Sequence, residues 1–349
     1  MGLRVEVKKR IGDFCLDVRF QSEASRIGIL GASGCGKSMT LKSIAGIESP
    51  DAGVIEVDGT VLYHSDRKVH VRPQKRNIGY LFQNYALFPT MTVAKNIEMG
   101  LKGTKQERAE RVREMIRTFR LDGLANRLPG ELSGGQQQRA ALARIMAYEP
   151  EVILLDEPFS ALDLFLKDRL QQEMMELLSD YHGIVVMVSH SRDEIYRFSE
   201  ELVVMDQGRA VTAGRTKDIF MNPKKKEAAR LTGCKNLTRV RRLDAHHIEA
   251  LDWGVELEIG REIPVETSWA GFRAHEFIPV WGERRKNCIR VCLAGMAELP
   301  FEKNFYLRPE HGAENICWFL QKDKWRMLEE KGLPDYLQFQ EEQILLLEE

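Results

Sequence analysis

A glycine-rich loop near the N-terminus carries the residue types that bind phosphate. Residues 31–38 read Gly-Ala-Ser-Gly-Cys-Gly-Lys-Ser, between an apolar run at 27–30 and a helix-forming segment at 39–46. This fits the pattern G-x-x-x-x-G-K-S in its strand-loop-helix context. Glycines let backbone N–H groups point at phosphate oxygens, and the N-terminus of the helix favours an anion. Lys37 offers a positive charge to the β and γ phosphates, and Ser38 offers a hydroxyl to Mg²⁺. We therefore expect ATP and Mg²⁺ as cofactors, with contacts from Gly31, Ala32, Ser33, Gly34, Cys35, Gly36, Lys37, Ser38 and Met39.

Two carboxylates follow a second apolar run. Residues 153–155 are Ile-Leu-Leu and lead directly into Asp156 and Glu157, after which Pro158 stops the strand. Acids at the carboxyl end of a buried parallel strand lie at the edge of the sheet where ligands bind. Asp156 is predicted to hold Mg²⁺ through water. Glu157 is predicted to polarise the attacking water as a general base.

A polar, glycine-rich turn opens a helix in the middle of the chain. Residues 132–139 read Leu-Ser-Gly-Gly-Gln-Gln-Gln-Arg, and strong helix formers follow. Ser133 is predicted to cap this helix and to leave N–H groups available to an anion.

Together with Gln83 and His190, these motifs resemble the ATP-binding cassette (ABC) ATPases over residues 1–232. The resemblance implies that Ser133, Gly134, Gly135 and Gln136 hold the γ-phosphate of ATP bound by a partner subunit. It therefore implies a head-to-tail dimer of two copies of this chain. It also implies a Q-loop at Gln83, a D-loop at residues 160–163, and a γ-phosphate sensor at His190. The predicted catalytic residues are then Glu157, His190 and Gln83, and the predicted metal contacts are Ser38, Gln83 and Asp156.

Two aromatic features have alternative interpretations. Phe14 either stacks on the adenine ring, as an aromatic residue in the first strands usually does in this family, or belongs to the core of the sheet. Residues 85–88 either receive the coupling helix of a membrane partner or form the core of a helical subdomain.

The elements that position these residues predict an α/β fold in two domains. Strands and helices alternate over 1–83 and 135–232, and residues 84–134 indicate a helical insert that contains a capping box, Thr104 to Glu107. Short alternating segments from residue 237 onward predict a small all-β, OB-like domain at 233–349. We thus expect a P-loop NTPase ABC cassette followed by a β domain. Residues 272–276 resemble the G-x-R-P-E segment of the accessory β domains in importer ATPases, with Ala274 in place of proline and alanine or phenylalanine in place of glycine.

Composition restricts the function classes. The 349 residues include 51 basic and 52 acidic residues, for a formal net charge of −1, so no nucleic-acid partner is expected. No apolar run approaches the length of a membrane span, and the N-terminal residues resemble a strand and not a signal peptide. The six cysteines show no paired spacing, which indicates reduced thiols in the cytosol and disfavours a zinc site at Cys288 and Cys292.

The β domain favours an importer over an exporter. The resemblance implies an ATPase on the cytoplasmic face of the cell membrane, peripheral to integral permease subunits and indirectly served by a periplasmic or extracellular solute-binding protein. Residues 14–20, 231–238 and 325–347 look like molybdate-type ATPases, which makes molybdate the expected solute. Importers of sulfate, iron(III) or sugar share the architecture. A soluble ABC ATPase of translation or DNA repair, and an anion-sensing regulator, are the other classes. Arg273, His275 and Lys303 are the polar candidates for an anion site in the β domain.

Overall fold

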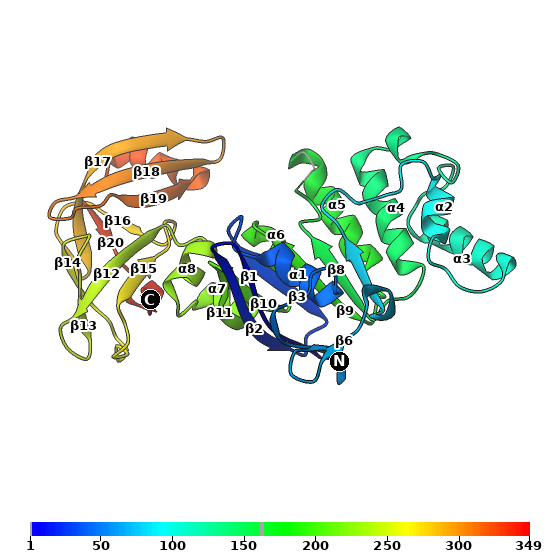
Figure 1. The fold of residues 1–349 in the computed structure, drawn as a ribbon. Helices are drawn as coiled ribbons and strands as arrows, with labels where there is room; N and C mark the ends of the chain where they lie inside the picture. Colours follow the sequence, from blue (N-terminus) through cyan, green and yellow to red (C-terminus); the bar gives the residue numbers. More distant parts are fainter. Residues whose placement is uncertain (1, 161–163) are drawn as a thin grey trace. The chain divides into compact units, whose positions relative to one another are not determined.

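The computed structural model describes residues 2–160 and 164–349. The chain forms two compact units, Met1–Lys217 and Asp218–Glu349. Figure 1 shows both units, with the second built mainly of strands.

The first unit is organised around one mixed sheet of eleven strands, in the order β6-β5-β4-β1-β2-β11-β10-β3-β9-β8-β7. The strands are β1 (Leu3–Ile11), β2 (Phe14–Ser22), β3 (Arg26–Gly31), β4 (Ala52–Val57), β5 (Thr60–His64), β6 (Val69–His70), β7 (Ile78–Leu81), β8 (Val152–Asp156), β9 (Ile184–Ser189), β10 (Glu201–Asp206) and β11 (Arg209–Arg215). The helices of this unit are α1 (Lys37–Ala45), α2 (Val93–Glu98), α3 (Lys105–Thr118), α4 (Gly134–Met146), α5 (Leu164–Leu177) and α6 (Arg192–Phe198), with short 3₁₀ turns at Pro73–Lys75 and Pro129–Glu131.

The parallel part of this sheet positions the site. Strands β7, β8, β9, β3 and β10 pair in parallel, and every residue of β8 and β9 is buried. Continuous apolar runs of this kind are typical of parallel strands with both faces covered. Because the carboxyl ends of parallel strands meet at one edge, the ends of β3, β8 and β9 bring the phosphate loop, Asp156 and the segment containing His190 together.

The predicted helical insert is present as α2 and α3, which lie beside α4 in Figure 1. The capping box is confirmed: the backbone N–H of Thr104 donates to Glu107 Oε2 at 2.7 Å, and the Thr104 side chain accepts from the backbone N–H of Glu107. The predicted apolar face of α3 is buried at Val112, Met115 and Phe119 and half-buried at Ile116.

The second unit contains two five-stranded sheets, in the orders β14-β13-β12-β15-β21 and β16-β20-β17-β18-β19. The strands are β12 (Asn236–Arg242), β13 (His247–Ala250), β14 (Val255–Glu258), β15 (Trp269–Phe272), β16 (Ile278–Val280), β17 (Cys288–Glu298), β18 (Glu302–Pro309), β19 (Ile316–Gln321), β20 (Tyr336–Gln338) and β21 (Leu345–Leu347). Residues of both sheets share one apolar core, centred on Trp253, Phe272, Trp318 and Phe339. The predicted C-terminal β domain is thereby confirmed.

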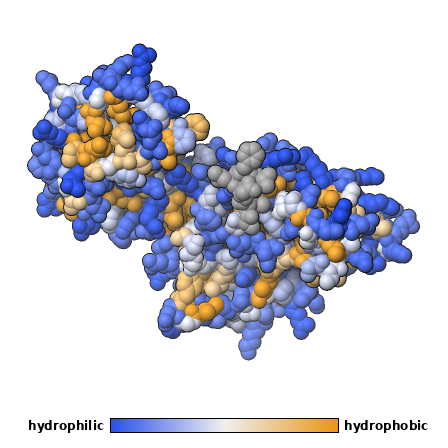
Figure 2. All heavy atoms as spheres, turned by 90° about the horizontal axis from the view of Figure 1, so that it is seen from above, coloured by the Kyte–Doolittle hydropathy of each residue, from blue (hydrophilic) through white to orange (hydrophobic). Residues whose placement is uncertain are grey.

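Three helices accompany these sheets: α7 (Thr216–Met221), α8 (Lys226–Leu231) and α9 (Trp325–Lys331), with short 3₁₀ turns at Lys322–Lys324 and Glu341–Gln343. The division between the compact units lies after Lys217, so α8 belongs to the second unit, whereas the sequence placed the domain boundary after residue 232. Figure 2 shows an apolar area on the surface of the second unit. The exposed large apolar side chains of this unit include Leu293, Met296 and Tyr306. Among the described residues, no helix is both long and apolar enough to span a membrane.

Candidate active site

The phosphate loop joins β3 to α1, and its conformation requires glycine. Gly34 and Gly36 have φ angles of +80° and +102°. A Cβ atom added to Gly36 would lie 2.6 Å from Leu16 Cδ1, which is closer than carbon atoms can pack. The glycines therefore leave a hollow lined by backbone at the N-terminus of α1, where an anion is favoured.

Lys37 lies in this hollow with 4% of its surface exposed. Its Nζ donates to the carbonyl oxygens of Gly31 at 2.8 Å and Ala32 at 2.9 Å. The same ammonium lies 3.8 Å from Glu157 Oε1. The loop thus holds one buried cation whose acceptors are carbonyls and a carboxylate, and phosphate oxygens are stronger acceptors than carbonyls for such a charge.

Asp156 ends β8 and is held by two hydroxyl groups. Ser38 Oγ donates to Asp156 Oδ1 at 2.7 Å, and the Tyr80 hydroxyl donates to Asp156 Oδ2, also at 2.7 Å. Burial and the neighbouring Asp156 carboxylate raise the pKa of Tyr80, so this hydroxyl keeps its proton at neutral pH. Ser38 and Asp156 together present hard oxygen donors, which suits Mg²⁺. No group of three or more His, Cys, Asp or Glu side chains arranged for a metal occurs among the described residues.

Glu157 occupies a backbone conformation that few non-glycine residues adopt, with a φ angle of +45°. Its backbone N–H donates to the carbonyl of Val188 on β9 at 3.2 Å. Its Oε2 lies 3.2 Å from His190 Nδ1, and its Oε1 faces Lys37. The turn therefore holds the carboxylate between an imidazole and the ammonium of the loop. Strain of this kind concentrates at functional sites.

Gln83 is linked to the backbone of Glu157 through Ser160. Gln83 Nε2 donates to Ser160 Oγ at 3.0 Å, and that hydroxyl donates to the backbone carbonyl of Glu157 at 2.9 Å. Ser160 is the first residue of the predicted D-loop, whose other residues, 161–163, lie outside the described residues.

A cavity of about 800 Å³ gathers most of these groups. Its lining includes Lys37, Ser38, Gln83 and Glu157, together with Phe14 at one wall. Phe14 also packs partly against the core of the sheet. The Phe14 side chain therefore borders both the cavity and the core of the sheet.

Four of the predicted residues lie elsewhere on the same unit. Ser133 caps α4: its Oγ accepts from the backbone N–H of Gln136 at 3.4 Å, and its own N–H donates to Gln136 Oε1 at 2.9 Å. Ser133, Gly134, Gly135 and Gln136 do not line the cavity of the phosphate loop. Within one chain, the two glycine-rich motifs therefore form separate helix N-termini.

Residues 85–88 include both buried and exposed side chains, so neither interpretation, core or surface, fits the whole segment. Tyr85 is buried, whereas Phe88 has 42% of its surface exposed and lies 5.7 Å from the guanidinium of Arg144. Tyr85 therefore belongs to the core and Phe88 to the surface.

One residue that supports the site, Tyr80, was not predicted from the sequence. The available signal was a polar aromatic residue in a strand directly before Gln83.

Comparison with known proteins shows which family this chain resembles in sequence. Residues 17–160 match the family model described as ABC transporter. The sulfate/thiosulfate import ATP-binding protein CysA of Thermosynechococcus vestitus is 40% identical over 252 residues, which cover 69% of this chain and 72% of that protein. The molybdate/tungstate import ATP-binding protein WtpC of Pyrococcus horikoshii is 40% identical over 231 residues, covering 65% and 64%. Further relatives carry iron(III) or putrescine in their names.

A solved structure supports the same family. The dimeric post-hydrolysis state of an ATP-binding cassette bound to ADP and Pi superposes with a TM-score of 0.52 at 28% identity, covering 62% of this chain and 99% of that one. The chain spans about three fifths of the length of several curated relatives that it matches. The similarity is therefore strongest over the unit that carries the phosphate loop.

Proposed function

Because the chain belongs to the ABC transporter family of ATP-binding proteins, we propose that it hydrolyses ATP as the ATP-binding subunit of an importer. The observation that carries this proposal is the convergence of Lys37, Ser38, Gln83 and Glu157 on one cavity at the end of a parallel sheet. A cation, a hydroxyl and a carboxylate next to a helix N-terminus are the groups that phosphoryl transfer to water requires.

Glu157 acts as the general base in this proposal. A water molecule beside its carboxylate gives up a proton to it while the water oxygen attacks the γ-phosphorus. The bond from that phosphorus to the oxygen bridging the β and γ phosphates breaks, and ADP leaves with the electron pair while inorganic phosphate forms. His190, at 3.2 Å from Oε2, fixes the orientation of the carboxylate. Lys37 leaves its carbonyl acceptors for the β and γ phosphates, which also frees Glu157 from its 3.8 Å contact with the ammonium.

Ser38, Asp156 and Gln83 are the residues that would hold Mg²⁺, which when bound neutralises negative charge on the phosphates. Tyr80 fixes Asp156 Oδ2, so that Oδ1 and the Ser38 hydroxyl face each other at 2.7 Å. Phe14 supplies an aromatic wall on which the adenine ring stacks.

A second copy of the chain completes the site. Ser133, Gly134, Gly135 and Gln136 form a capped helix N-terminus suited to an anion, and they do not line the cavity of the phosphate loop in their own chain. In the proposed twofold dimer, each copy presents this motif to the ATP on the other copy. The dimeric cassette among the similar structures supports this arrangement.

We place the dimer at the cytoplasmic face of the cell membrane, beneath integral permease subunits. Exposed Phe88 is a candidate contact for a permease helix. The imported solute is an oxyanion in our proposal, and molybdate is the candidate that the sequence favours. Relatives named for sulfate/thiosulfate and for molybdate/tungstate are each 40% identical to this chain, and one named for iron(III) is 43% identical, so identity does not separate these solutes. An iron(III) importer is the alternative, and a sugar importer shares the architecture.

Hydrolysis of ATP by the purified chain tests the core of the proposal. Glu157→Gln keeps the shape of the side chain and removes the base, so we expect nucleotide binding to persist and turnover to fall by roughly 10²–10⁴-fold. Glu151→Gln is a matched control, because Glu151 directly precedes the same strand at its opposite end and pairs with Asn77. Near-normal turnover by Glu157→Gln would show that another group is the base.

The solute requires a separate experiment. Co-purification with a permease would support the transport role over a soluble role in translation or repair. Stimulation of ATP hydrolysis in liposomes, compared among molybdate, sulfate and iron(III) with the respective binding proteins, would identify the solute. Retention of full activity without association with any permease would instead favour the non-transport reading.

A further inference from the structure

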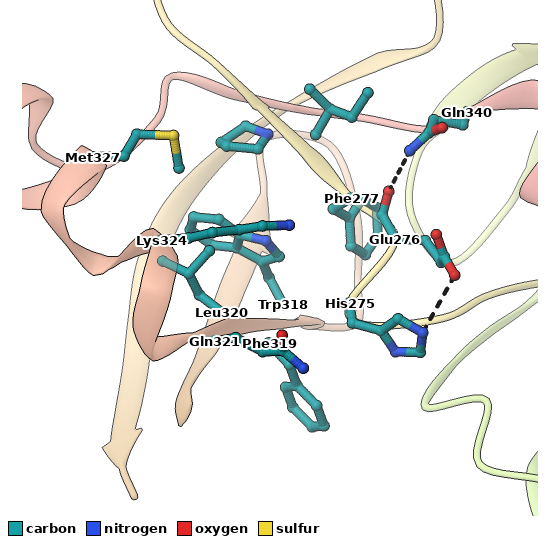
Figure 3. Close-up of a pocket in the computed structure, with 12 residues that line it drawn as sticks. His275, Glu276, Phe277, Trp318, Phe319, Leu320, Gln321, Lys324, Met327 and Gln340 are labelled. Atoms are coloured by element: carbon teal, nitrogen blue, oxygen red, sulfur yellow. Dashed lines mark hydrogen bonds and ion pairs between the residues drawn. The ribbon is translucent and has the colours of Figure 1, made fainter. Parts of the chain in front are cut away.

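The anion site expected in the second unit is not assembled from its three candidate side chains. Of these, only His275 lines the cavity of about 490 Å³ drawn in Figure 3, where its Nε2 lies 3.3 Å from Glu276 Oε1. Arg273 donates to two backbone carbonyls, and Lys303 pairs with Glu298 at 3.6 Å. Each of the three side chains thus contacts a partner of its own.

A buried ion pair of the first unit, in contrast, lies next to the candidate active site and has no role in the hydrolysis described above. Glu194 of α6 has 5% of its surface exposed, and its Oε1 pairs with the ammonium of Lys167 on α5. Its Oε2 accepts from the Ser189 hydroxyl at 2.5 Å. A buried ion pair adds little net stability over apolar side chains of similar volume. Stability alone therefore does not account for this pair.

The Ser189 hydroxyl joins the ion pair to the loop that carries His190. Ser189 ends β9 and is buried. Its Oγ donates to Glu194 and accepts from the backbone N–H of Ser191 at 2.9 Å. Because Ser189 precedes His190 in the sequence and Ser191 follows it, this one hydroxyl holds the backbone on both sides of the histidine.

The start of α6 differs from an ordinary capping box in the same place. Ser191 is the N-cap and Glu194 the third helical residue, the spacing at which a glutamate side chain accepts from the backbone N–H of the cap. Here that N–H donates to Ser189 Oγ, and Glu194 accepts from the same hydroxyl. The Ser189 side chain is thus inserted between the two halves of the box. The Glu194 carboxylate therefore orients the end of β9 as well as the helix.

His190 depends on this backbone for its orientation. Its imidazole is about half exposed, and its Nδ1 lies 3.2 Å from Glu157 Oε2. The rotamers open to a side chain depend on its backbone conformation. The backbone N–H of Glu157 donates to the carbonyl of Val188, the residue before Ser189. A shift of residues 189–191 would therefore change the contact between His190 and the proposed general base.

We propose that Glu194 is a positioning residue for ATP hydrolysis. Lys167 and Ser189 contact the two oxygens of its carboxylate, and the Ser189 hydroxyl fixes the backbone around His190. Lys167, Ser189 and Glu194 do not line the cavity of the phosphate loop, so they act on the reaction through His190 and its contact with Glu157. This inference rests on the proposed function, in which His190 orients the general base.

A second ion pair between the same two helices provides a matched control. Asp168 of α5 and Arg197 of α6 pair at 2.9 Å, one residue beyond Lys167 and three residues beyond Glu194. Both side chains of this second pair are exposed, and they do not line the cavity. The two pairs join α5 to α6 alike, but the buried pair also contacts the end of β9. Asp168→Asn therefore removes a link between the helices without changing the support of His190.

The imidazole signal of His190 tests the positioning without any ATP turnover. In the full chain labelled with ¹³C-histidine, this NMR signal is identified by its loss in His190→Ala. We expect the signal to shift in Glu194→Gln, which retains the shape of the side chain but loses the charge that pairs with Lys167. It should stay in place in Asp168→Asn. Ser189→Ala makes the same test with a smaller change, because it removes only the hydroxyl. An unmoved signal in either folded variant, Glu194→Gln or Ser189→Ala, overturns the proposal.

Turnover assays show whether this position matters for hydrolysis. Glu194→Gln should lower kcat about tenfold and leave the KM for ATP within about twofold, because the contacts to the phosphates are unchanged. In a His190→Ala background, measured by single-turnover hydrolysis, the same change should cost less than about twofold, since both substitutions act through one group. Equal losses in the two backgrounds would mean that Glu194 acts on the reaction by a route other than His190.

Variants of Lys167 separate the charge of the ion pair from its packing. Lys167→Met should lower kcat about as much as Glu194→Gln, and Lys167→Arg should recover most of that loss because it restores a cation beside the carboxylate. If the unmodified chain hydrolyses no ATP, the proposed function fails, whereas the His190 signal still decides the positioning. If Lys167→Met, Lys167→Arg and Asp168→Asn all retain the kcat of the unmodified chain, the ion pair has no part in hydrolysis and the proposal is wrong.

Discussion

Asp156 illustrates how single residues set the geometry of the site. Its carboxylate is buried at the end of β8, and Ser38 and Tyr80 each donate a hydrogen bond to one of its two oxygens. A buried carboxylate without donors is strongly disfavoured. Tyr80 is therefore part of the support of the site although it does not line the cavity.

Tyr80→Phe should lower the free energy of unfolding by about 1.5–3 kcal/mol, the range for a hydrogen bond to a charged group. Tyr63→Phe is the matched control, because the Tyr63 hydroxyl is also buried but donates to the neutral carbonyl of Pro50 at 2.7 Å. Its loss should cost about 1 kcal/mol. Urea denaturation of both variants measures the difference. Equal losses of unfolding free energy in the two variants would mean that the hydrogen bond from Tyr80 to Asp156 stabilises the protein no more than a hydrogen bond to a neutral carbonyl.

The residues that sequence could identify are those that lie close together in the chain or end a recognisable strand. Lys37 and Ser38 belong to one motif, and Asp156 and Glu157 follow an unmistakable apolar run. Tyr80 and Ser160 act through partners more than seventy residues away in sequence, Asp156 and Gln83 respectively. The role of Tyr80 follows from the register of β7 against β8, which places Tyr80 opposite Leu154, and no local pattern encodes that pairing. Ser160 was expected as part of the D-loop, but its hydrogen bond to Gln83 was not.

At the scale of elements, α4 begins with a capping box that also serves as the proposed contact to a second copy. Ser133→Arg removes the cap and places a bulky cation at the helix N-terminus. We expect nucleotide binding by the single chain to persist while ATP hydrolysis is lost. Loss of the cap alone should cost about 1 kcal/mol of stability.

Two further variants make this result specific. Thr104→Arg removes the equivalent capping box of α3 and should reduce stability similarly while retaining hydrolysis. Lys37→Ala should weaken nucleotide binding itself, because the phosphates lose their nearest cation. Fluorescent-nucleotide titration and turnover assays separate these outcomes. If Ser133→Arg and Lys37→Ala lose binding equally, the shared interface site is wrong.

The connection from α8 to β12 contains a thiol that should make stability depend on alkaline pH. Cys234 has 2% of its surface exposed, and its Sγ donates to the carbonyl of Asn236 at 3.3 Å. Burial raises the pKa of Cys234 from 9.0 to about 11. The folded state therefore retains the proton over a range in which the unfolded chain has lost it. The resulting stabilisation is fully present below about pH 9 and is lost as the pH rises toward 11.

Comparison with Cys234→Ala isolates this thiol from the other groups that titrate at high pH. The difference in unfolding free energy between the two proteins should be constant up to about pH 8.5. It should then shift by about 2–3 kcal/mol against the wild-type chain by pH 11. Denaturant titrations at a series of pH values measure it. A difference that stays flat to pH 11 would mean that the thiol ionises as readily in the folded state as in the unfolded state.

At the scale of the whole molecule, the sequence predicted the two-part architecture better than the strands of the second part. The segments now seen as β13, β14, β17, β19 and β21 were expected from their alternating apolar residues. Strand β15, Trp269–Phe272, was not, because three of its four residues are buried and leave no alternation. Strand β18 begins with charged residues and becomes a strand by pairing with both β17 and β19. Such pairing depends on distant segments, which a local pattern does not report.

The boundary between the two parts also depends on contacts between residues that are far apart in the sequence. Lys226 of α8 lies 3.8 Å from the centre of the Trp269 ring, and Lys225 pairs with Glu348 at 3.1 Å. Ala229 is fully buried in a small apolar cluster with Cys234, Leu345 and Leu347. Helix α8 is thus stabilised by the C-terminal strands. An ATPase fragment that ends at residue 232 would retain α8 but lose these partners.

Truncation after Lys217 should therefore give a better-behaved ATPase than truncation after Thr232. Every described contact of the candidate site is made by residues before Lys217, and Thr216 completes the first unit by contacting Ser199 at 2.9 Å. We expect the 1–217 fragment to hydrolyse ATP at a rate near that of the full chain. The 1–232 fragment should be equally active per folded molecule but should associate more, because Ala228 and Ala229 become exposed. Size-exclusion chromatography, circular dichroism and turnover assays on both fragments measure this. A 1–217 fragment that is folded but inactive would show that the C-terminal unit takes part in hydrolysis itself.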